Sequence, residues 1–446
     1  MVFSIHDLHQ KYGPYVRVSP TQIAVADLPS VLAIHSQNDP YDKTEWYKRA
    51  ASGVDTMAGF VEHHRYLQRR KALGTGFSNS NLKKLEPVVQ RHITACFSKI
   101  KAELEATGIS NVLSCFRLMT TDVIGELCYG INFGLVENGE FLQLNEFAKS
   151  LYGSFFILGA RAQMPVMKGL EKALSFIPHP LVQWFLGCNR RIEEYGIKCL
   201  DDLQREIGDC KDSSGKPRPS IFTQILDNTN NQDAKYRIDK RALIDEAGAM
   251  LIVGSQTVAL QATYTMWTLH KHKVIREKLR KELEGIDWDT SDEKLQGLPY
   301  MTAVLKEALR LYSPGQIGLA RVIPQGGRQL GPYFFPAGTE VVTNTFTVHR
   351  NSEIFDEPLL FKPERWFNTT KEMESAMMAF GGISRICLGI NLAMMELRIL
   401  VATMFKMCPD LDLAESCTDE SMEFENYLVL SPKGRKCEFK CSAGGT

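Results

Sequence analysis

The sequence predicts a mainly helical α+β fold that forms one domain over residues 1–446. Helical periodicity dominates the middle of the chain, from about residue 62 to residue 311, whereas strand-like alternation occurs near both ends. No internal repeat divides the chain. With 446 residues, 44% of them apolar, and 23 Phe, 14 Tyr and 5 Trp, the chain can bury a large core and an apolar cavity.

The charge balance and the cysteines exclude several classes of function. The 52 basic side chains equal the 52 acidic ones, and phosphate binding needs a basic excess, so nucleic acid is not an expected partner. The 11 cysteines contain no CxxC pair, which argues against a zinc ribbon or a dithiol redox site. We expect them to be reduced, in a chain that faces the cytosol. The sequence has no run of about 18 apolar residues, so it predicts no membrane-spanning helix.

The first half of the chain reads as two strands followed by helices. Residues 14–26 alternate between apolar and polar side chains, which predicts two short strands joined by a turn. Residues 62–210 show helical patterns, with breaks at Gly74-Thr75-Gly76 and at Pro178-His179-Pro180. The polar stretch 209–220 contains Gly and Pro and predicts a surface loop inside the same domain, because helical patterns lie on both sides of it.

Residues 238–270 give the longest helical pattern, which would extend about 45 Å. Its centre, AGAMLIVGSQTVAL, is apolar almost all round and is expected to be buried. Gly254 is a weak helix former, and Ser255, Gln256 and Thr257 are polar groups that need hydrogen bonds or a cavity. Two interpretations stay open. One is a kinked helix whose polar notch faces a ligand, and the other is a packing glycine beside locally bonded side chains.

The second half of the chain mixes helices and strands. Residues 271–311 predict charged amphipathic helices, and two β-like runs follow, GLARVI at 318–323 and TEVVTNTFTV at 339–348. Residues 352–380 look irregular and aromatic. A helix resumes after Cys387, and the tail from residue 425 predicts strands.

The strongest local motif is a Gly-rich stretch, FGGISRICLG at 380–389, which places Cys387 just before the apolar helix NLAMMELRILVATMF. Backbone N–H groups and the helix dipole favour a thiolate at such a helix N-terminus, and Arg385 adds positive charge. Gly389 allows a flat group to approach the backbone closely. Thiolate ligation of haem iron needs this arrangement, although one cysteine taken alone is more simply a small buried side chain.

Two further motifs precede the cysteine. Glu307 and Arg310 lie at positions i and i+3 of one predicted helix, which by itself is a routine helix pair. The motif Pro363-Glu364-Arg365-Trp366 follows in the irregular stretch, where Arg365 is able to close a buried ion-pair network. Such a network specifies geometry more than it adds stability.

In this order and spacing, the three motifs resemble the cytochrome P-450 superfamily, over almost the whole chain and most closely its fungal microsomal members. The resemblance implies that Cys387, as thiolate, is the axial ligand of the iron of haem b. It implies that Glu307, Arg310 and Arg365 form a structural triad that supports the cysteine loop. It also implies a set of haem contacts: Tyr66, Arg70, Arg321, Phe380, Gly381, Arg385 and Gly389.

The centre of the long helix resembles the oxygen-activation groove of the family, which implies catalytic roles for Gly254, Gln256 and Thr257. Gly254 and Thr257 match the family pattern, but Gln256 replaces its acid and Val253 replaces a small residue. Ile383 stands where the cysteine loop usually has Gly. Gln neither donates nor accepts a proton at pH 7, although it still positions water, so proton delivery by an altered route is one reading.

The resemblance implies a monooxygenase that uses dioxygen and electrons passed from NADPH by a separate reductase. The expected substrate is lipophilic, such as a fungal terpenoid, polyketide or alkaloid. The alternatives are an atypical enzyme that couples, cyclises, desaturates or rearranges its substrate without inserting oxygen, and a non-catalytic haem or lipid-binding protein. The expected pocket walls, besides Thr257, are Ala249, Val253, Ile317, Tyr427 and Leu428.

The resemblance also bears on location. Family members are held at the cytosolic face of the endoplasmic reticulum by an N-terminal anchor, and the resemblance implies the same location here. This chain as given does not include the anchor, so a soluble protein is the alternative expectation. The stretch 154–186 is rich in apolar and aromatic residues and is expected to contact the membrane surface or to pack as a lid on the core. We expect a monomer.

Overall fold

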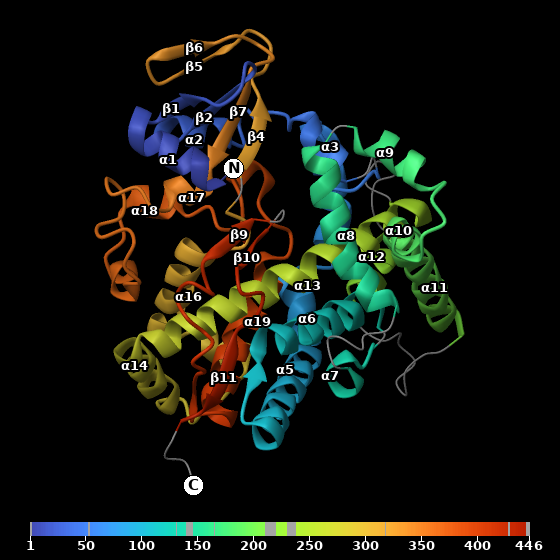
Figure 1. The fold of residues 1–446 in the computed structure, drawn as a ribbon, viewed down its shortest axis with the longest axis vertical. Helices are drawn as coiled ribbons and strands as arrows, with labels where there is room; N and C mark the ends of the chain where they lie inside the picture. The colour runs from blue at the N-terminus through green and yellow to red at the C-terminus, as the bar shows by residue number, and fades with distance from the viewer. Residues whose placement is uncertain are drawn as a thin grey trace.

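The computed structural model describes residues 2–51, 54–130, 132–139, 146–164, 166–209, 220–229, 238–316, 318–426 and 429–442. One long helix, α13 (Lys240–Lys271), runs through the middle of the molecule, with a small sheet beyond one of its sides and further helices around it (Figure 1). It packs against α6, α11, α16 and α19. The predicted mainly helical α+β class is therefore confirmed.

The described helices occupy most of the chain. They are α1 (Val2–Tyr12), α2 (Leu28–Ile34), α3 (Glu45–Ala50), α4 (His63–Gly74), α5 (Asn79–Thr107), α6 (Val112–Tyr129), α7 (Leu135–Asn138), α8 (Glu146–Gln163), α9 (Met167–Leu174), α10 (Pro180–Leu186), α11 (Cys188–Asp209), α12 (Ile221–Thr229), α13, α14 (Lys273–Glu284), α15 (Asp292–Gln296), α16 (Pro299–Tyr312), α17 (Thr345–Val348), α18 (Lys371–Ala376) and α19 (Ile390–Met407), with the 3₁₀ turns η3 (Pro363–Phe367) and η4 (Ile383–Arg385). The expected break at Gly74 is where α4 ends, whereas the expected loop 209–220 lies almost entirely outside the described residues.

The largest sheet joins the two predicted N-terminal strands to strands that follow the helical middle of the chain. Its order is β1 (Tyr15–Arg17), β2 (Gln22–Val25), β7 (Glu340–Asn344) and β4 (Gly318–Val322), and the β2–β7 pair is parallel. Three smaller sheets pair β3 (Ser110–Asn111), β11 (Glu438–Cys441) and β8 (Leu411–Leu413); β9 (Phe424–Asn426) and β10 (Leu430–Pro432); and β5 (Arg328–Leu330) and β6 (Tyr333–Phe335). In the parallel β2–β7 pair, Ala24 lies beside Val342.

Helix α13 begins and ends with ordinary capping chemistry. The Asp239 side chain accepts a hydrogen bond from the Ala242 N–H, and His270 and Lys271 lie in the last turn, where the helix dipole favours positive charge. Of the described helices, α13 is the one that is long and apolar enough to span a membrane, but 56% of its most apolar window is buried inside the protein. The burial identifies α13 as a core helix, which agrees with the sequence prediction.

One sequence expectation needs correction, and one further stretch shows features of both expected alternatives. The run TEVVTNTFTV does not continue as a strand, because Asn344 ends β7 and its side chain accepts a hydrogen bond from the Phe346 N–H, which starts the helix α17. The stretch 154–186 is not uniformly exposed. Ser154 and Ile157 of α8 are buried, whereas the exposed apolar side chains lie further on and include Phe176 and Leu181.

Candidate active site

The cysteine loop is held by its own backbone at the N-terminus of α19. The Cys387 N–H donates to the Phe380 carbonyl over 2.9 Å, and the Gly389 N–H donates to the Cys387 sulfur. Gly381 has φ +89°, a conformation that an L side chain rarely adopts, so glycine is required where the loop turns. The structure thus bears out the local geometry expected for a thiolate at a helix N-terminus.

The environment of Cys387 combines open surface with a dense protein surround. The Cys387 side chain is exposed, and burial by the surrounding chain is the largest cause that raises the pKa of its thiol. The Gly389 N–H and the Arg70 charge act in the opposite direction and lower that pKa. A hypothetical Cβ on Gly389 would find its nearest neighbour, in Phe77, 4.0 Å away, so the protein leaves the expected approach path of a flat group free.

Helix α4 lies directly against this loop. Arg70 donates to the Ile386 carbonyl over 2.6 Å and to the Tyr66 hydroxyl over 2.9 Å. The Arg385 guanidinium lies over the Tyr66 ring, 4.9 Å from its centre. Tyr66 and Arg70, predicted from the family pattern, therefore connect the peptide before Cys387 to Arg385.

Three cations are buried together near this connection: Lys43, Arg321 and Arg385, each at most 8% exposed. Burial, with the charges of Arg385 and Arg321, lowers the pKa of Lys43 far below its ordinary value. Burial and the Arg321 charge likewise lower the pKa of Arg385 to about 10. The Asp42 carboxylate is 3.9 Å from Arg385 and half exposed, which leaves most of the buried positive charge uncompensated.

The hydrogen bonds of these cations are incomplete. Arg385 donates to the Phe60 and Val61 carbonyls, and Arg321 donates to the Ala320 carbonyl. The Nε atoms of both arginines are buried, and neither has a hydrogen-bond partner within the described chain. Buried cations with unmatched donors favour an anionic ligand. A thiol at a helix N-terminus beside such cations fits haem, whose iron takes the sulfur and whose propionates take the cations.

The predicted triad is present. Arg310 and Arg365 both donate to the Glu307 carboxylate, at 2.8 Å and 3.0 Å, and Trp366 donates its indole N–H to the same carboxylate over 3.0 Å. Glu307 and Arg310 have no exposed surface. The backbone N–H of Lys362 also donates to the Glu307 carboxylate. A network of ion pairs and hydrogen bonds therefore joins helix α16 to the segment around η3.

A histidine extends this network toward the cysteine loop. His349 is fully buried, and burial lowers the pKa of its imidazole to about 3, so the ring is neutral. Its Nδ1–H donates to the Arg310 carbonyl over 3.0 Å, and its Nε2 accepts the Met378 N–H over 3.0 Å. Because Met378 lies two residues before Phe380, this pair of bonds connects the triad with the start of the cysteine loop.

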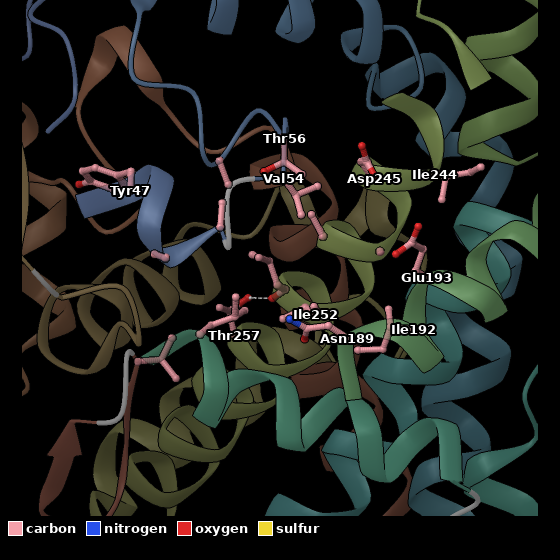
Figure 2. A pocket seen from close by; sticks show the side chains of 18 of the residues that line it. Tyr47, Val54, Thr56, Asn189, Ile192, Glu193, Ile244, Asp245, Ile252 and Thr257 are labelled. Carbon is pink, nitrogen blue, oxygen red and sulfur yellow. Dashed lines mark hydrogen bonds between the residues drawn. The ribbon is translucent and has the colours of Figure 1, made fainter. Parts of the chain in front are cut away.

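An apolar cavity of about 360 Å³ opens beside α13. Ala249, Val253 and Thr257 line it, as the sequence predicts, together with Trp46 and Tyr47 of α3. Figure 2 shows Val54 and Thr56 across the cavity from Thr257 and Ile252. One end carries polar groups from α11 and α13, which are Asn189, Glu193, Arg241 and Asp245. The other predicted wall residues, Ile317, Tyr427 and Leu428, lie outside the described residues.

The polar centre of α13 shows features of both interpretations. The Thr257 hydroxyl donates to the Val253 carbonyl over 3.0 Å and faces the cavity (Figure 2). A Cβ on Gly254 would lie 3.0 Å from Ile124, so this glycine lets α13 pack closely on α6. Gln256 is buried and is not among the described residues that line the cavity. Thr257 and Val253 thus form the cavity-facing part of the predicted groove.

Sequence reasoning missed three buried ionisable side chains. Lys43 completes the cation cluster, Glu246 of α13 pairs with Arg69 over 2.7 Å, and Glu396 of α19 is fully buried. The signal for Glu396 was present, because it is the one acid in the helix sequence INLAMMELRILVATMFKM. Lys43 and Glu246 carry no comparable signal, since their partners are distant in sequence.

Comparison with known proteins agrees with this geometry. Residues 1–439 match the sequence model described as cytochrome P-450. The chain is 32% identical to the cytochrome P-450 monooxygenase orf2 of Aspergillus niger, over 96% of this chain and 86% of that protein. It is 30% identical to the monooxygenase azaI of the same species, over 95% and 93%, and 29% identical to the monooxygenase stcB of Emericella nidulans, over 97% and 82%.

Proposed function

The chain belongs to the cytochrome P-450 family of haem-thiolate monooxygenases, and on this premise we propose that it inserts one oxygen atom into a lipophilic secondary metabolite of a fungus. The observation that carries the proposal is Cys387, whose sulfur accepts the Gly389 N–H at the N-terminus of α19 while its side chain is exposed. We propose haem b as the cofactor, held by this sulfur and by the cations.

Each group of residues has a separate part in the proposed reaction. Haem, when bound, supplies the oxygen-activating redox chemistry. Arg321, Arg385 and Lys43 hold its carboxylates, and Arg70 with the Gly389 N–H stabilises negative charge on the sulfur. The apolar cavity excludes water and binds the substrate, and Thr257 holds a hydroxyl proton at the Val253 carbonyl, beside the substrate.

The substrate class follows from the lining of the cavity. Its volume of about 360 Å³ suits a drug-sized molecule, and most of the side chains around it are apolar or aromatic. The polar end at Asn189, Glu193, Arg241 and Asp245 gives such a molecule hydrogen-bonding partners at one end. A terpenoid, polyketide or alkaloid with an oxygen or nitrogen at one end satisfies both halves of the cavity.

We also propose a separate NADPH-dependent reductase as electron donor, and attachment to the cytosolic face of the endoplasmic reticulum. Exposed apolar side chains near α9 and α10 support membrane contact, with Phe176 80% and Leu181 70% exposed. Vesicle flotation of the purified chain tests this contact. A Phe176→Ser, Leu181→Ser protein is expected to float less than the parent.

The decisive test of the proposed function combines a spectrum with a product analysis. The reduced protein with carbon monoxide should show the absorption band typical of thiolate-ligated haem. With NADPH and a fungal reductase it should convert a lipophilic metabolite into a product that carries one atom from isotopically labelled dioxygen. A protein that gives the band but no oxygenated product with any metabolite contradicts the proposed reaction.

Gln256 favours a second candidate, an oxidation that adds no oxygen, such as coupling, ring closure, desaturation or rearrangement. Where the family has an acid, Gln256 is a buried amide, which neither gives up nor takes up a proton at neutral pH. Mass spectrometry distinguishes the two reactions, because the second product gains no oxygen. If Gln256→Glu leaves both rate and product unchanged, the reason for this candidate disappears.

A further inference from the structure

We propose that Glu246 is a positioning residue that fixes the segment 54–61 as one wall of the substrate cavity, and that it thereby sets which ligands fit. This inference rests on the proposed function, because it concerns the cavity that the substrate would enter. It assigns a specificity-determining role to a charged pair between α13 and α4 that contacts neither the cysteine loop nor the cavity itself.

The segment 54–61 forms part of the cavity. Val54, Thr56 and Ala58 line it, and Figure 2 shows Val54 and Thr56 on the side opposite Thr257. The segment consists of turns and residues without regular secondary structure between α3 and α4, so it has no sheet or helix of its own to fix it. Its position therefore depends on side chains that come from elsewhere in the chain.

Glu246 of helix α13 supplies one such contact. Its Oε1 atom accepts the Met57 N–H over 2.6 Å and a hydrogen bond from Arg69 over 2.7 Å. Arg69 in turn donates to the Asp55 carbonyl over 3.2 Å. One carboxylate oxygen thus holds the segment directly at Met57 and, through Arg69, at Asp55.

Other contacts to the segment come from Arg65, which donates to the Asp55 carboxylate over 2.8 Å, and from the proposed cofactor site. Lys43 donates to the Ala58 carbonyl over 2.7 Å, and Arg385 donates to the Phe60 and Val61 carbonyls over 3.0 Å and 2.7 Å. Changes at these two cations would alter the cofactor site and the cavity wall together. Glu246 and Arg69 hold the same segment without a hydrogen bond to Arg321 or Arg385. The Glu246 carboxylate does act electrostatically on Lys43, which Glu246→Ala changes and Arg69→Ala leaves in place.

The position of Glu246 on α13 explains why the pair matters for ligand choice. Glu246 lies seven residues before Val253 and eleven before Thr257 on one uninterrupted helix, and both of those residues line the cavity. The carboxylate therefore links two facing walls, one rigid and one without regular structure. Its side chain is 3% exposed, so loss of either partner leaves a buried charge unmatched.

The test compares a large and a small ligand of the same iron site. Imidazole needs little more than the iron, whereas 4-phenylimidazole also places a phenyl ring in the cavity. Their dissociation constants are measured by spectral titration of the ferric protein and of its Glu246→Ala, Glu246→Gln and Arg69→Ala variants. We expect Glu246→Ala and Arg69→Ala to weaken 4-phenylimidazole about tenfold, or about 1.4 kcal/mol, with imidazole unchanged.

Glu246→Gln is the conservative rescue, because its amide oxygen still accepts the Met57 N–H while the charge on Arg69 is lost. Its effect is expected to be smaller than that of Glu246→Ala. Hydrogen exchange gives a second measurement, with faster exchange at Met57 and its neighbours in the Ala variants. If Glu246→Ala does not fold, Arg69→Ala and Glu246→Gln carry the comparison.

A matched control is available on the surface. The Lys83–Glu293 pair has the same 2.7 Å separation, but its side chains are 70% and 75% exposed. Glu293→Ala should leave both dissociation constants unchanged. An unchanged ratio of the two constants in the Glu246 and Arg69 variants would overturn the inference. Failure of the parent protein to bind imidazole would instead refute the proposed haem site.

Discussion

Two buried clusters of charged side chains lie close to the cysteine loop, and they differ in how completely their hydrogen-bond donors are matched. In the cluster around Glu307, Arg310 and Arg365 donate to one carboxylate, and their remaining N–H groups donate to main-chain carbonyls such as those of His349 and Pro358. In the cluster of Lys43, Arg321 and Arg385, the three charges have the same sign and two Nε atoms are unmatched.

The difference separates a structural role from a binding role. A cluster whose buried N–H groups are hydrogen-bonded within the protein fixes the chain around it and gains nothing from a ligand. A cluster that buries unmatched donors destabilises the protein by itself and is stabilised by an anion. The first cluster therefore supports the fold around the cysteine loop, and the second is the part of the loop's surroundings that takes the cofactor's carboxylates.

The largest effect is expected from breaking the matched cluster. Glu307→Gln leaves two buried guanidinium groups without a counter-charge, which should cost about 3–5 kcal/mol of unfolding free energy. Denaturant unfolding measures it, and little folded, haem-loaded protein should be recovered. Recovery of a protein with parental stability would mean that the cluster is not matched in the way described.

A second prediction concerns a buried acid outside both clusters. Burial raises the pKa of Glu396 to about 8, and its Oε2 has no partner among the described residues. The folded chain thus holds this proton more tightly than the unfolded chain, so the unfolding free energy should fall as pH rises from about 4.5 to about 8. Each unit of pKa difference contributes about 1.4 kcal/mol.

Glu396→Gln removes this proton and should flatten the decline, with the largest gain in stability at pH 8 and little change at pH 4.5. Unfolding measured across this pH range checks the sign. A variant that is less stable than the parent at pH 8 would show that Glu396 is ionised and has a partner.

The unmatched cluster should respond in the opposite sense to the matched one. Arg321→Leu removes a buried charge, so the cofactor-free protein should be no less stable than the parent, whereas haem should dissociate about tenfold faster. Transfer of haem to a scavenger apoprotein measures that rate. Arg310→Leu is the control, because it should lower the stability of the protein with or without haem. Equal loss of stability in both variants would erase the distinction between the clusters.

The sequence predicted those parts of the site that lie within short motifs. The long helix and the place of Cys387 before a helix follow from local pattern, whereas the triad and the Tyr66–Arg70 pair were implied by the family resemblance. Contacts between distant segments were not predictable, because nothing in the spacing places Lys43 beside Ala58 or Glu246 beside Met57. The TFTV segment shows the same limit, since a side-chain cap from Asn344 overrides the strand preference of its β-branched residues.

The most direct test of the central claim is the reduced carbon monoxide spectrum of Cys387→Ser, measured beside Cys441→Ser as a control at another exposed cysteine. The assignment predicts that Cys441→Ser keeps the band of thiolate-ligated haem and that Cys387→Ser loses it while other haem absorption remains. A Cys387→Ser protein that keeps the thiolate band would contradict the assignment.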